Sequence, residues 1–385
     1  MARKTTAYAP RLLLAATALA FAVPTAASAQ IGGFETEISK AKKKKAKVKK
    51  QPIVDVRLDP NWEGPKSISE ALKLVEADGQ IVVHPGVYQP EAVNIRKNVS
   101  IRGIRDDYGK APTLTAKGSC LNVNSASVSA RVSDLTFRAS DRSCINVSMG
   151  SLELTDSNVL GKRAGAGYAY SDPSGHLTPF TPESAMNAKS ALVSIKGGRV
   201  RISNSTITGG DTGVLIAPNN SNAFDHVDLQ NNTISQMSGV GVVMRGDVDA
   251  TLASNTIVSN QMSGVVYAAT GHARLVGNII SNNTHNGLFV QGMGEAVSIE
   301  GNKIHDNSED GIEVRSGIAI LVNNDIGEHK GCKVNPNAPA EGTSDHLAMP
   351  PIRLLADSRG VNTYDTSQAC TKKTAKKKKR GLRRG

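Results

Sequence analysis

A short phrase recurs along this chain about every 23 residues, and it limits the fold more than any other feature. In each copy an asparagine or serine stands two residues before an isoleucine. A self-repeat of this length is typical of a solenoid, in which each unit buries its apolar side by stacking on its neighbours. Functional residues should therefore lie on the outer surface of a stack. Spacings of 27, 23, 23, 24 and 22 residues separate the closing isoleucines, which are Ile207, Ile234, Ile257, Ile280, Ile304 and Ile326.

A second mark follows each isoleucine by about seven residues. It is a glycine that opens an apolar run, as at Gly241, Gly264, Gly287 and Gly311. Short β-branched runs separated by Asn, Gly, Ser and Asp are typical of strands and tight turns, and they leave no room for helical repeats. The sequence therefore predicts an all-β solenoid of about eight coils between residues 114 and 332.

The residues before the repeats resemble the opening of a known fold. The segments 67–72, 79–88 and 98–103 are similar to the first turns of right-handed parallel β-helix proteins of the pectin-lyase-like superfamily. The resemblance covers roughly residues 53–335 and implies a right-handed parallel β-helix. That superfamily contains lyases, hydrolases, epimerases and non-catalytic proteins, so the resemblance implies no single chemistry.

A capping helix is predicted at the start of the solenoid. Ser67 and Glu70 form a capping-box pattern, and Gly79 is expected to end the helix. Such a helix would cover the first coil, whose bare strand edge could otherwise pair with another chain. Its apolar stripe consists of Ile68, Ala71, Leu72 and Val75.

The remaining regions are predicted from charge and composition. Residues 1–29 read as a signal peptide of the bacterial export type, which predicts a periplasmic or secreted protein with no transmembrane segment after cleavage. Disordered basic tails are expected at both ends, because charge repulsion prevents packing. The order is a signal peptide (1–29), a Lys-rich linker (30–52), the β-helix (53–335), a closing segment (336–370) and a basic tail (371–385).

The net charge of +12 is concentrated in the tails. Residues 40–50 hold eight lysines and residues 371–385 hold nine basic residues, whereas residues 51–370 hold 26 basic against 32 acidic residues. The tails either serve as a solubilising fringe or attach the protein to an anionic envelope surface or acidic polysaccharide. Nucleic-acid binding is not expected, because the compartment is wrong and the tails contain no interleaved aromatic residues.

Four cysteines in an exported chain suggest two disulfides, with three connectivities open. Cys120 and Cys144 hold equivalent positions on adjacent coils, so their Cα atoms should lie about 4.8 Å apart, within disulfide range. Cys332 would then pair with Cys370. No metal site is predicted, because the cysteines lack CxxC spacing and the histidines occupy different phases of the repeat.

The asparagine of each repeat is predicted to have a structural role. Stacked asparagines in one turn can bond to one another through their amide groups along the coil axis. A row that binds a ligand would need to point outward instead. The predicted ladder contains Asn232, Asn255, Asn278, Asn302 and Asn324.

The resemblance implies a binding groove over the strand that follows each repeat glycine. There the outward residues Leu215, Val243, Val266 and Phe289 form an apolar row. A loop of about 30 residues after Leu160 is expected either to cover this row or to form an aromatic platform for sugar rings. The binding candidates are Tyr168, Tyr170 and Phe180 of the loop, with Arg245 and Gln291 on the same face.

An acidic cluster farther along the same face is the candidate catalytic site. Paired carboxylates can act as acid and base in glycoside hydrolysis, and a carboxylate-bound Ca²⁺ with a basic residue would suit β-elimination. The alternative is an ordinary solvated surface. The cluster contains Asp306, Glu309, Asp310, Glu313 and Arg315, with His285 as a candidate base.

Three functions remain open from the sequence. The first is an exported, non-catalytic protein that binds an acidic polysaccharide or envelope partner along its outer face. The second is a polysaccharide lyase, epimerase or hydrolase using the acidic cluster; the Gly-His-Gly, Arg-Ile-Lys and Asp-Pro-His-Asp signatures of such enzymes do not occur here. The third is an adhesin or assembly scaffold. No cofactor is expected, apart from Ca²⁺ if the protein is a lyase.

Overall fold

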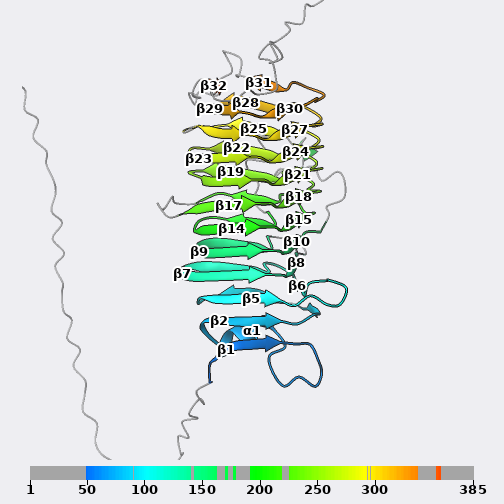
Figure 1. Cartoon of the computed structure of the whole chain (residues 1–385), viewed down its shortest axis with the longest axis vertical. Helices are drawn as coiled ribbons and strands as arrows, with labels where there is room; N and C mark the ends of the chain where they lie inside the picture. The colour runs from blue at the N-terminus through cyan, green and yellow to red at the C-terminus, as the bar shows by residue number, and fades with distance from the viewer. Residues whose placement is uncertain are drawn as a thin grey trace, which may run out of the picture. The chain divides into compact units, whose positions relative to one another are not determined.

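The chain forms a stack of parallel coils (Figure 1). The computed structural model describes residues 49–89, 91–139, 143–162, 170–171, 177–178, 191–218, 225–292, 294, 296–336 and 353–356. These residues lie within one compact unit, Val48–Gly385. No helix of the described residues is long and apolar enough to cross a bilayer.

Each regular coil contains three short strands. The first strands of the coils pair in parallel to form a ten-stranded sheet. These strands are β3 (Val87–Tyr88), β6 (Thr113–Ala116), β8 (Thr136–Ala139), β10 (Asn158–Leu160), β15 (Thr206–Thr208), β18 (Thr233–Ser235), β21 (Thr256–Val258), β24 (Ile279–Ser281), β27 (Lys303–His305) and β30 (Asp325–Ile326).

The second and third strands belong to one twenty-stranded sheet, because β7 (Leu121–Ser133) and β9 (Ile145–Thr155) run through both positions. The other second strands are β4 (Val93–Ile95), β13 (Val193–Ile195), β16 (Val214–Ile216), β19 (Val242–Gly246), β22 (Val265–Ala269), β25 (Leu288–Gln291), β28 (Ile312–Ser316) and β31 (Val334–Pro336). The other third strands are β2 (Val75–Val83), β5 (Val99–Gly103), β14 (Arg199–Ser203), β17 (His226–Gln230), β20 (Asp249–Ala253), β23 (His272–Val276), β26 (Val297–Glu300), β29 (Ile318–Val322) and β32 (Arg353–Ala356), and β1 (Gln51–Val56) pairs with β2.

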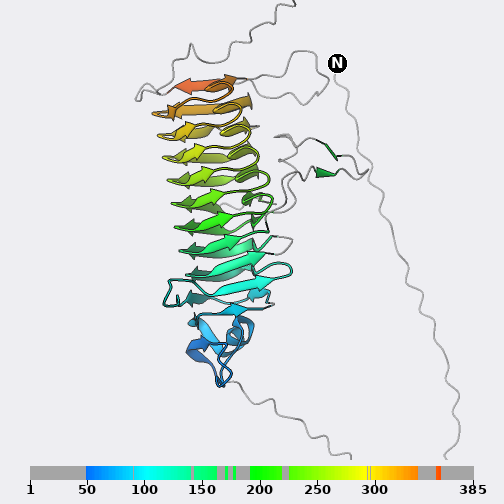
Figure 2. The same cartoon turned by 90° about the vertical axis from the view of Figure 1, so that its right-hand side faces the viewer.

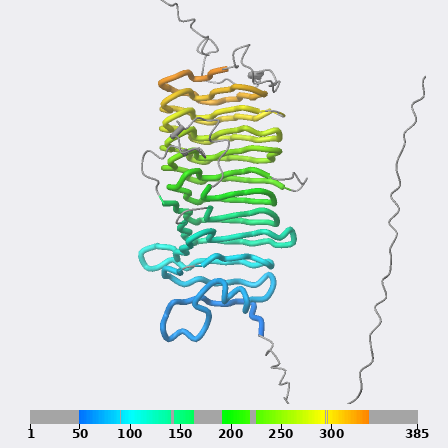
Figure 3. Tube along the Cα trace, turned by 180° about the vertical axis from the view of Figure 1, so that it is seen from behind, coloured from blue at the N-terminus to red at the C-terminus, as the bar shows by residue number. Residues whose placement is uncertain are grey.

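The register confirms that equal phase in the sequence means neighbours in space. Ile234 lies opposite Ile207 on one side and Ile257 on the other, and all three are fully buried. The same pairing continues through Ile280, Ile304 and Ile326. Figure 2 shows the strands stacked in this way, and Figure 3 shows the coils of the backbone one upon another. The core is therefore a continuous apolar column inside the coils.

Two details differ from the sequence predictions. The stack begins before residue 114, because β3 already pairs with β6 and the ten-stranded sheet exceeds the eight coils expected. The capping helix α1 (Ile68–Leu74) ends before Gly79, because Val75 is already extended and starts β2. Ser67 accepts the N–H of Glu70 as predicted, and the buried carboxylate of Glu91 accepts the N–H groups of Ile68 and Ser69.

Candidate functional site

The predicted asparagines form a buried ladder inside one turn of the stack. Each Nδ2 donates to the Oδ1 of the next asparagine at 2.9–3.0 Å, and each backbone N–H donates to the same oxygen at 2.8–3.0 Å. The residue before each ladder asparagine has a positive φ, which favours glycine or asparagine, as at Gly277 and Asn323. These side chains face inward and bond to the fold itself. They are Asn232, Asn255, Asn278, Asn302 and Asn324, each at most 1% exposed.

A second asparagine ladder was not predicted. Asn260 donates to Asn283 at 2.9 Å, and Asn283 donates to Asn307 at 3.0 Å. The N–H of Asn307 then donates to Nδ1 of His329 at 3.2 Å, so a histidine takes the next position of the ladder. Each of these asparagines lies three residues after a repeat isoleucine, and the same count that found the first ladder would have found this one.

A disulfide joins adjacent coils at the predicted position. Cys120 and Cys144 are bonded, with their Cα atoms 4.7 Å apart. Cys332 is also disulfide-bonded. Cys370, its predicted partner, lies outside the described residues, so that pairing stays a prediction.

Three pairs of oppositely charged side chains lie on the third strands. Arg131 lies opposite Glu153 at 3.5 Å, Arg201 opposite Asp228 at 3.2 Å, and Arg274 approaches Glu300 at 3.8 Å. Cross-strand pairs of opposite sign stabilise a sheet by small amounts. The same strands also carry the exposed Arg102 and Arg199.

The second strands carry the apolar row, and it is buried. Leu215, Val243, Val266 and Phe289 are in register and at most 1% exposed, within a cluster separate from the main core. The aromatic candidates Tyr168 and Phe180 lie outside the described residues. Tyr170 belongs to β11 (Tyr170–Ser171), which pairs with the antiparallel strand β12 (Leu177–Thr178).

The other two binding candidates lie at the ends of second strands. Arg245 is in β19 and is partly buried. Gln291 ends β25 and is also partly buried. Neither residue lines the groove described below.

Two members of the acidic cluster fasten neighbouring coils together. Glu313 is 5% exposed; it accepts from Asn286 at 2.7 Å and from Arg315 at 2.9 Å. Asp310 is 9% exposed and accepts from the N–H of Cys332 and from Asn335. This differs from the expected open groove, in which Glu313 would face solvent. The alternation of side chains along the strand predicted that Glu313 points away from the coil, but it did not predict that Glu313 is buried.

The rest of the cluster is divided between separate pairs. His305 contacts Asp306 at 2.7 Å, and His285 contacts Glu309 at 3.2 Å. Arg315 lies over the Phe289 ring at 5.0 Å, and burial lowers the pKa of its guanidinium. Within the described ranges, no group of three or more His, Cys, Asp or Glu side chains is placed to bind a metal ion.

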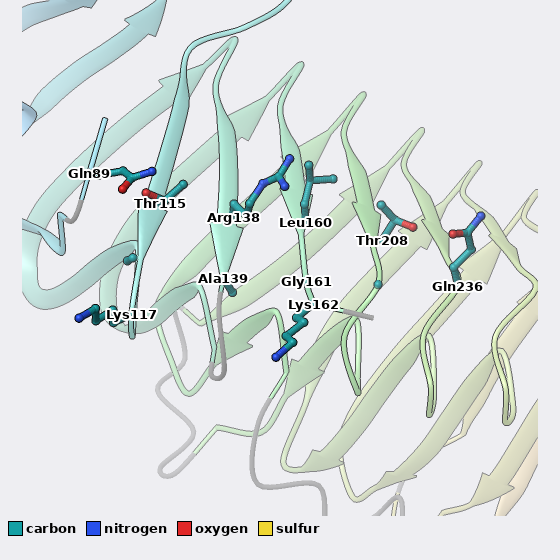
Figure 4. A pocket seen from close by; sticks show the side chains of 12 residues that line it. Gln89, Thr115, Lys117, Arg138, Ala139, Leu160, Gly161, Lys162, Thr208 and Gln236 are labelled. Carbon is teal, nitrogen blue, oxygen red and sulfur yellow. The ribbon is translucent and has the colours of Figure 1, made fainter. Parts of the chain in front are cut away.

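A groove of about 660 Å³ crosses the outer face of the ten-stranded sheet in its N-terminal half (Figure 4). Its side chains come from strands β3 to β18 and from the residues directly after them, and Arg138 lies opposite Thr115 and Leu160. Ala116, Ala139 and Gly161 follow that row, so the floor beside it is lined by small residues. We call this set of side chains the groove row: Thr115, Arg138, Leu160 and Thr208, which are in register, and Gln89, which directly follows β3.

Three cations give this groove its character. Lys117, Arg138 and Lys162 are all exposed, and none forms an ion pair with another described residue. They stand out because the rest of residues 51–370 has more acidic than basic residues. Sequence reasoning missed the groove, because its row contains a different residue type in almost every coil. The arrangement can bind an elongated anion.

A family model agrees with the fold of the later coils. Residues 190–343 match a family model described as "Right handed beta helix region". Among solved structures, the chain is similar to the periplasmic alginate epimerase AlgG, at 13% identity over 73% of this chain and 77% of that chain (TM-score 0.32). It is also similar to pectate lyase Pel9A, at 13% identity over 85% and 83% (TM-score 0.40), and to ORF18 of Geobacillus virus E2, at 10% identity over 74% and 55% (TM-score 0.42).

No curated protein matches the sequence. The family model covers the coils from β13 onward, and the parallel register extends the same architecture back to β2. Residues 190–343 therefore form a right-handed β-helix region, and the described coils before them continue the same parallel stack.

Proposed function

We propose that this protein binds an acidic polysaccharide in the groove on its ten-stranded sheet. The observation that carries the proposal is a set of three exposed cations in the groove: Lys117, Arg138 and Lys162. None of them is ion-paired with a carboxylate of a described residue. Electrostatic attraction to a polyanion needs positive charges that no neighbouring carboxylate neutralises.

The neutral side chains of the groove suit a sugar polymer. Thr115 and Thr208 carry hydroxyls, and Gln89 and Gln236 carry amides, which exchange hydrogen bonds with sugar hydroxyls. Leu160 and the small residues beside it offer apolar surface to the C–H faces of a ring. A long, shallow groove of this size accepts a segment of a chain rather than a compact small molecule.

We favour a binding role for the protein over a catalytic role for the acidic cluster. Asp310 and Glu313 hold neighbouring coils through hydrogen bonds, so they are engaged in the fold. The described residues that line the groove include no Asp, Glu or His. General acid–base catalysis needs such a group within hydrogen-bond reach of the reacting atoms.

The proposed location is the periplasm or the cell exterior. The disulfide between Cys120 and Cys144 is typical of oxidising compartments, which fits the signal peptide predicted for residues 1–29. The Lys-rich segments near both ends would add electrostatic attachment to an anionic envelope surface. In this proposal the tails set location and the groove sets the ligand.

The test is a binding titration of the mature chain with polygalacturonate and with neutral dextran at low and high salt. Polygalacturonate should bind, dextran should not, and the affinity should fall with salt. The double variant Arg138→Gln/Lys162→Gln should weaken binding roughly tenfold per charge removed. Lys303→Gln is the matched control, because Lys303 is an exposed cation of the same sheet outside the groove.

Two results would refute the proposal. One is equal affinity for the neutral and the acidic polymer. The other is unchanged polygalacturonate binding in the double variant, which would place the binding on the tails.

A further inference from the structure

The three cations of the groove alternate between its two sides. Arg138 belongs to the groove row, opposite Thr115 on one neighbouring coil and Leu160 on the other. Lys117 and Lys162 each stand two residues beyond those neighbours, so they hold equivalent positions on the flanking coils. Figure 4 shows Arg138 beside Thr115 and Leu160, with both lysines on the other side of the groove.

The spacing of these charges follows from the strand geometry. Neighbouring strands lie about 4.8 Å apart, so Lys117 and Lys162, two coils apart, are separated by about 10 Å along the stack. Arg138 lies on the coil between them, displaced by two residues, or about 7 Å, along the strand direction. The cations therefore form a zigzag with one charge per coil.

We infer that the groove recognises an extended glycuronan with a carboxylate on every sugar, in a conformation that places successive carboxylates on opposite sides. This inference rests on the proposed function and adds the charge pattern of the ligand. One sugar ring lies over each coil, so that three consecutive carboxylates meet Lys117, Arg138 and Lys162 in turn. The apolar floor at Ala139 and Gly161 receives the ring faces.

A polymer with a carboxylate on every second sugar would fit differently. In the same extended conformation all its carboxylates point to one side. They could meet Lys117 and Lys162, which share a side, but would leave Arg138 facing a neutral sugar. Binding of the polymer with a carboxylate on every sugar therefore depends on Arg138, whereas binding of the alternating polymer does not.

The experiment compares two oligosaccharides of equal length, an oligogalacturonate and a hyaluronan fragment in which uronic acid alternates with a neutral sugar. Arg138→Gln should weaken oligogalacturonate binding about tenfold and hyaluronan binding less than about twofold. Lys162→Gln should weaken both about tenfold. Circular dichroism of each variant checks that the fold is retained.

Each other outcome has a distinct meaning. Similar losses for both ligands with Arg138→Gln, or no loss for either, would overturn the zigzag and leave polysaccharide binding intact. Absence of binding of both ligands by the unmodified chain would overturn the proposed function itself.

Discussion

Two outward-facing rows of this molecule occupy comparable positions in the repeat and differ completely in surroundings. The apolar row of the second strands, from Leu215 to Phe289, is almost fully buried. The groove row of the first strands is mostly polar, and its Arg138 is exposed in an open groove. Both rows are held in register by the same parallel pairing.

The difference shows that the repeat fixes direction but not environment. Alternation along a strand decides whether a side chain points into the coil or away from it. Whether an outward side chain meets water depends on what lies outside the coil, which the period does not encode. Matched substitutions in the two rows therefore separate packing from binding.

The largest effect is expected from placing a carboxylate in each row. Val266→Asp buries an unpaired charge and should destabilise the protein by about 4 kcal/mol or more, or prevent folding. Leu160→Asp, an aliphatic residue of the groove row, should cost less than about 1 kcal/mol but weaken binding of an acidic polysaccharide. Urea denaturation measures both; equal destabilisation would abolish the distinction between the rows.

The next effect concerns the inner ladder. Asn255→Ala removes the acceptor of both the N–H and the Nδ2 of Asn232, and both groups are buried. We expect a loss of about 3 kcal/mol, since each unsatisfied buried group costs about 1–3 kcal/mol. Thr256→Ala, at the outward-facing neighbour, is the control and should cost under about 1 kcal/mol. A small loss for Asn255→Ala would show that the ladder adds little stability.

A smaller, pH-dependent effect is expected at His329. Burial lowers its pKa, while the carbonyl of Ile304 and the carboxylates of Asp306 and Asp310 oppose the shift and His305 adds to it. The unfolded chain therefore binds a proton more readily, so the contribution of His329 is complete above about pH 6.5 and is lost as pH falls below that value. Protonation also removes the acceptor of the Asn307 N–H.

The variant His329→Asn tests this contribution, because asparagine continues the ladder without titrating. Denaturation midpoints at pH 8 and pH 5 should differ less for the variant than for the parent chain. An identical pH dependence in both would assign the acid sensitivity to other groups.

The smallest effect on stability is expected in the groove. Lys117→Gln and Lys162→Gln remove exposed charges that form no ion pair with described residues, so each should change the free energy of unfolding by less than about 0.5 kcal/mol. Thermal denaturation checks this. A large loss would mean that these lysines hold the fold and would remove the basis for reading them as ligand contacts.

Most of the fold was predictable, because the repeat period of the sequence determines which residues stack on neighbouring coils. The isoleucines, the first ladder and the Cys120–Cys144 bond all follow from equal phase on stacked coils. The predicted helix end at Gly79 was wrong. The helix ends earlier because Val75 begins strand β2 and pairs with Gln51 of β1. Pairing overrode a local signal there.

The groove was not predictable by the same means. Its residues share a position but not a type, and the search for repeated letters passes over Gln89, Arg138 and Leu160. Glu313 shows the converse, since its position was read correctly as outward while its burial depends on Asn286 and Arg315. A ligand site on a repeat protein lies where the repeats differ, so a periodic analysis finds the scaffold first.

The first ladder also restricts how this protein can change in length. Each inner ladder asparagine accepts through its side-chain carbonyl from the coil before it and donates to that of the coil after it, as Asn255 does between Asn232 and Asn278. A duplicated coil would bring its own donor and acceptor and leave every amide matched. An insertion of part of a coil would shift the phase of the repeat and leave an amide donor and an amide acceptor without partners. Related chains should thus differ by whole coils, and an engineered version could be extended in steps of 22 to 24 residues, the observed repeat lengths between Ile234 and Ile326.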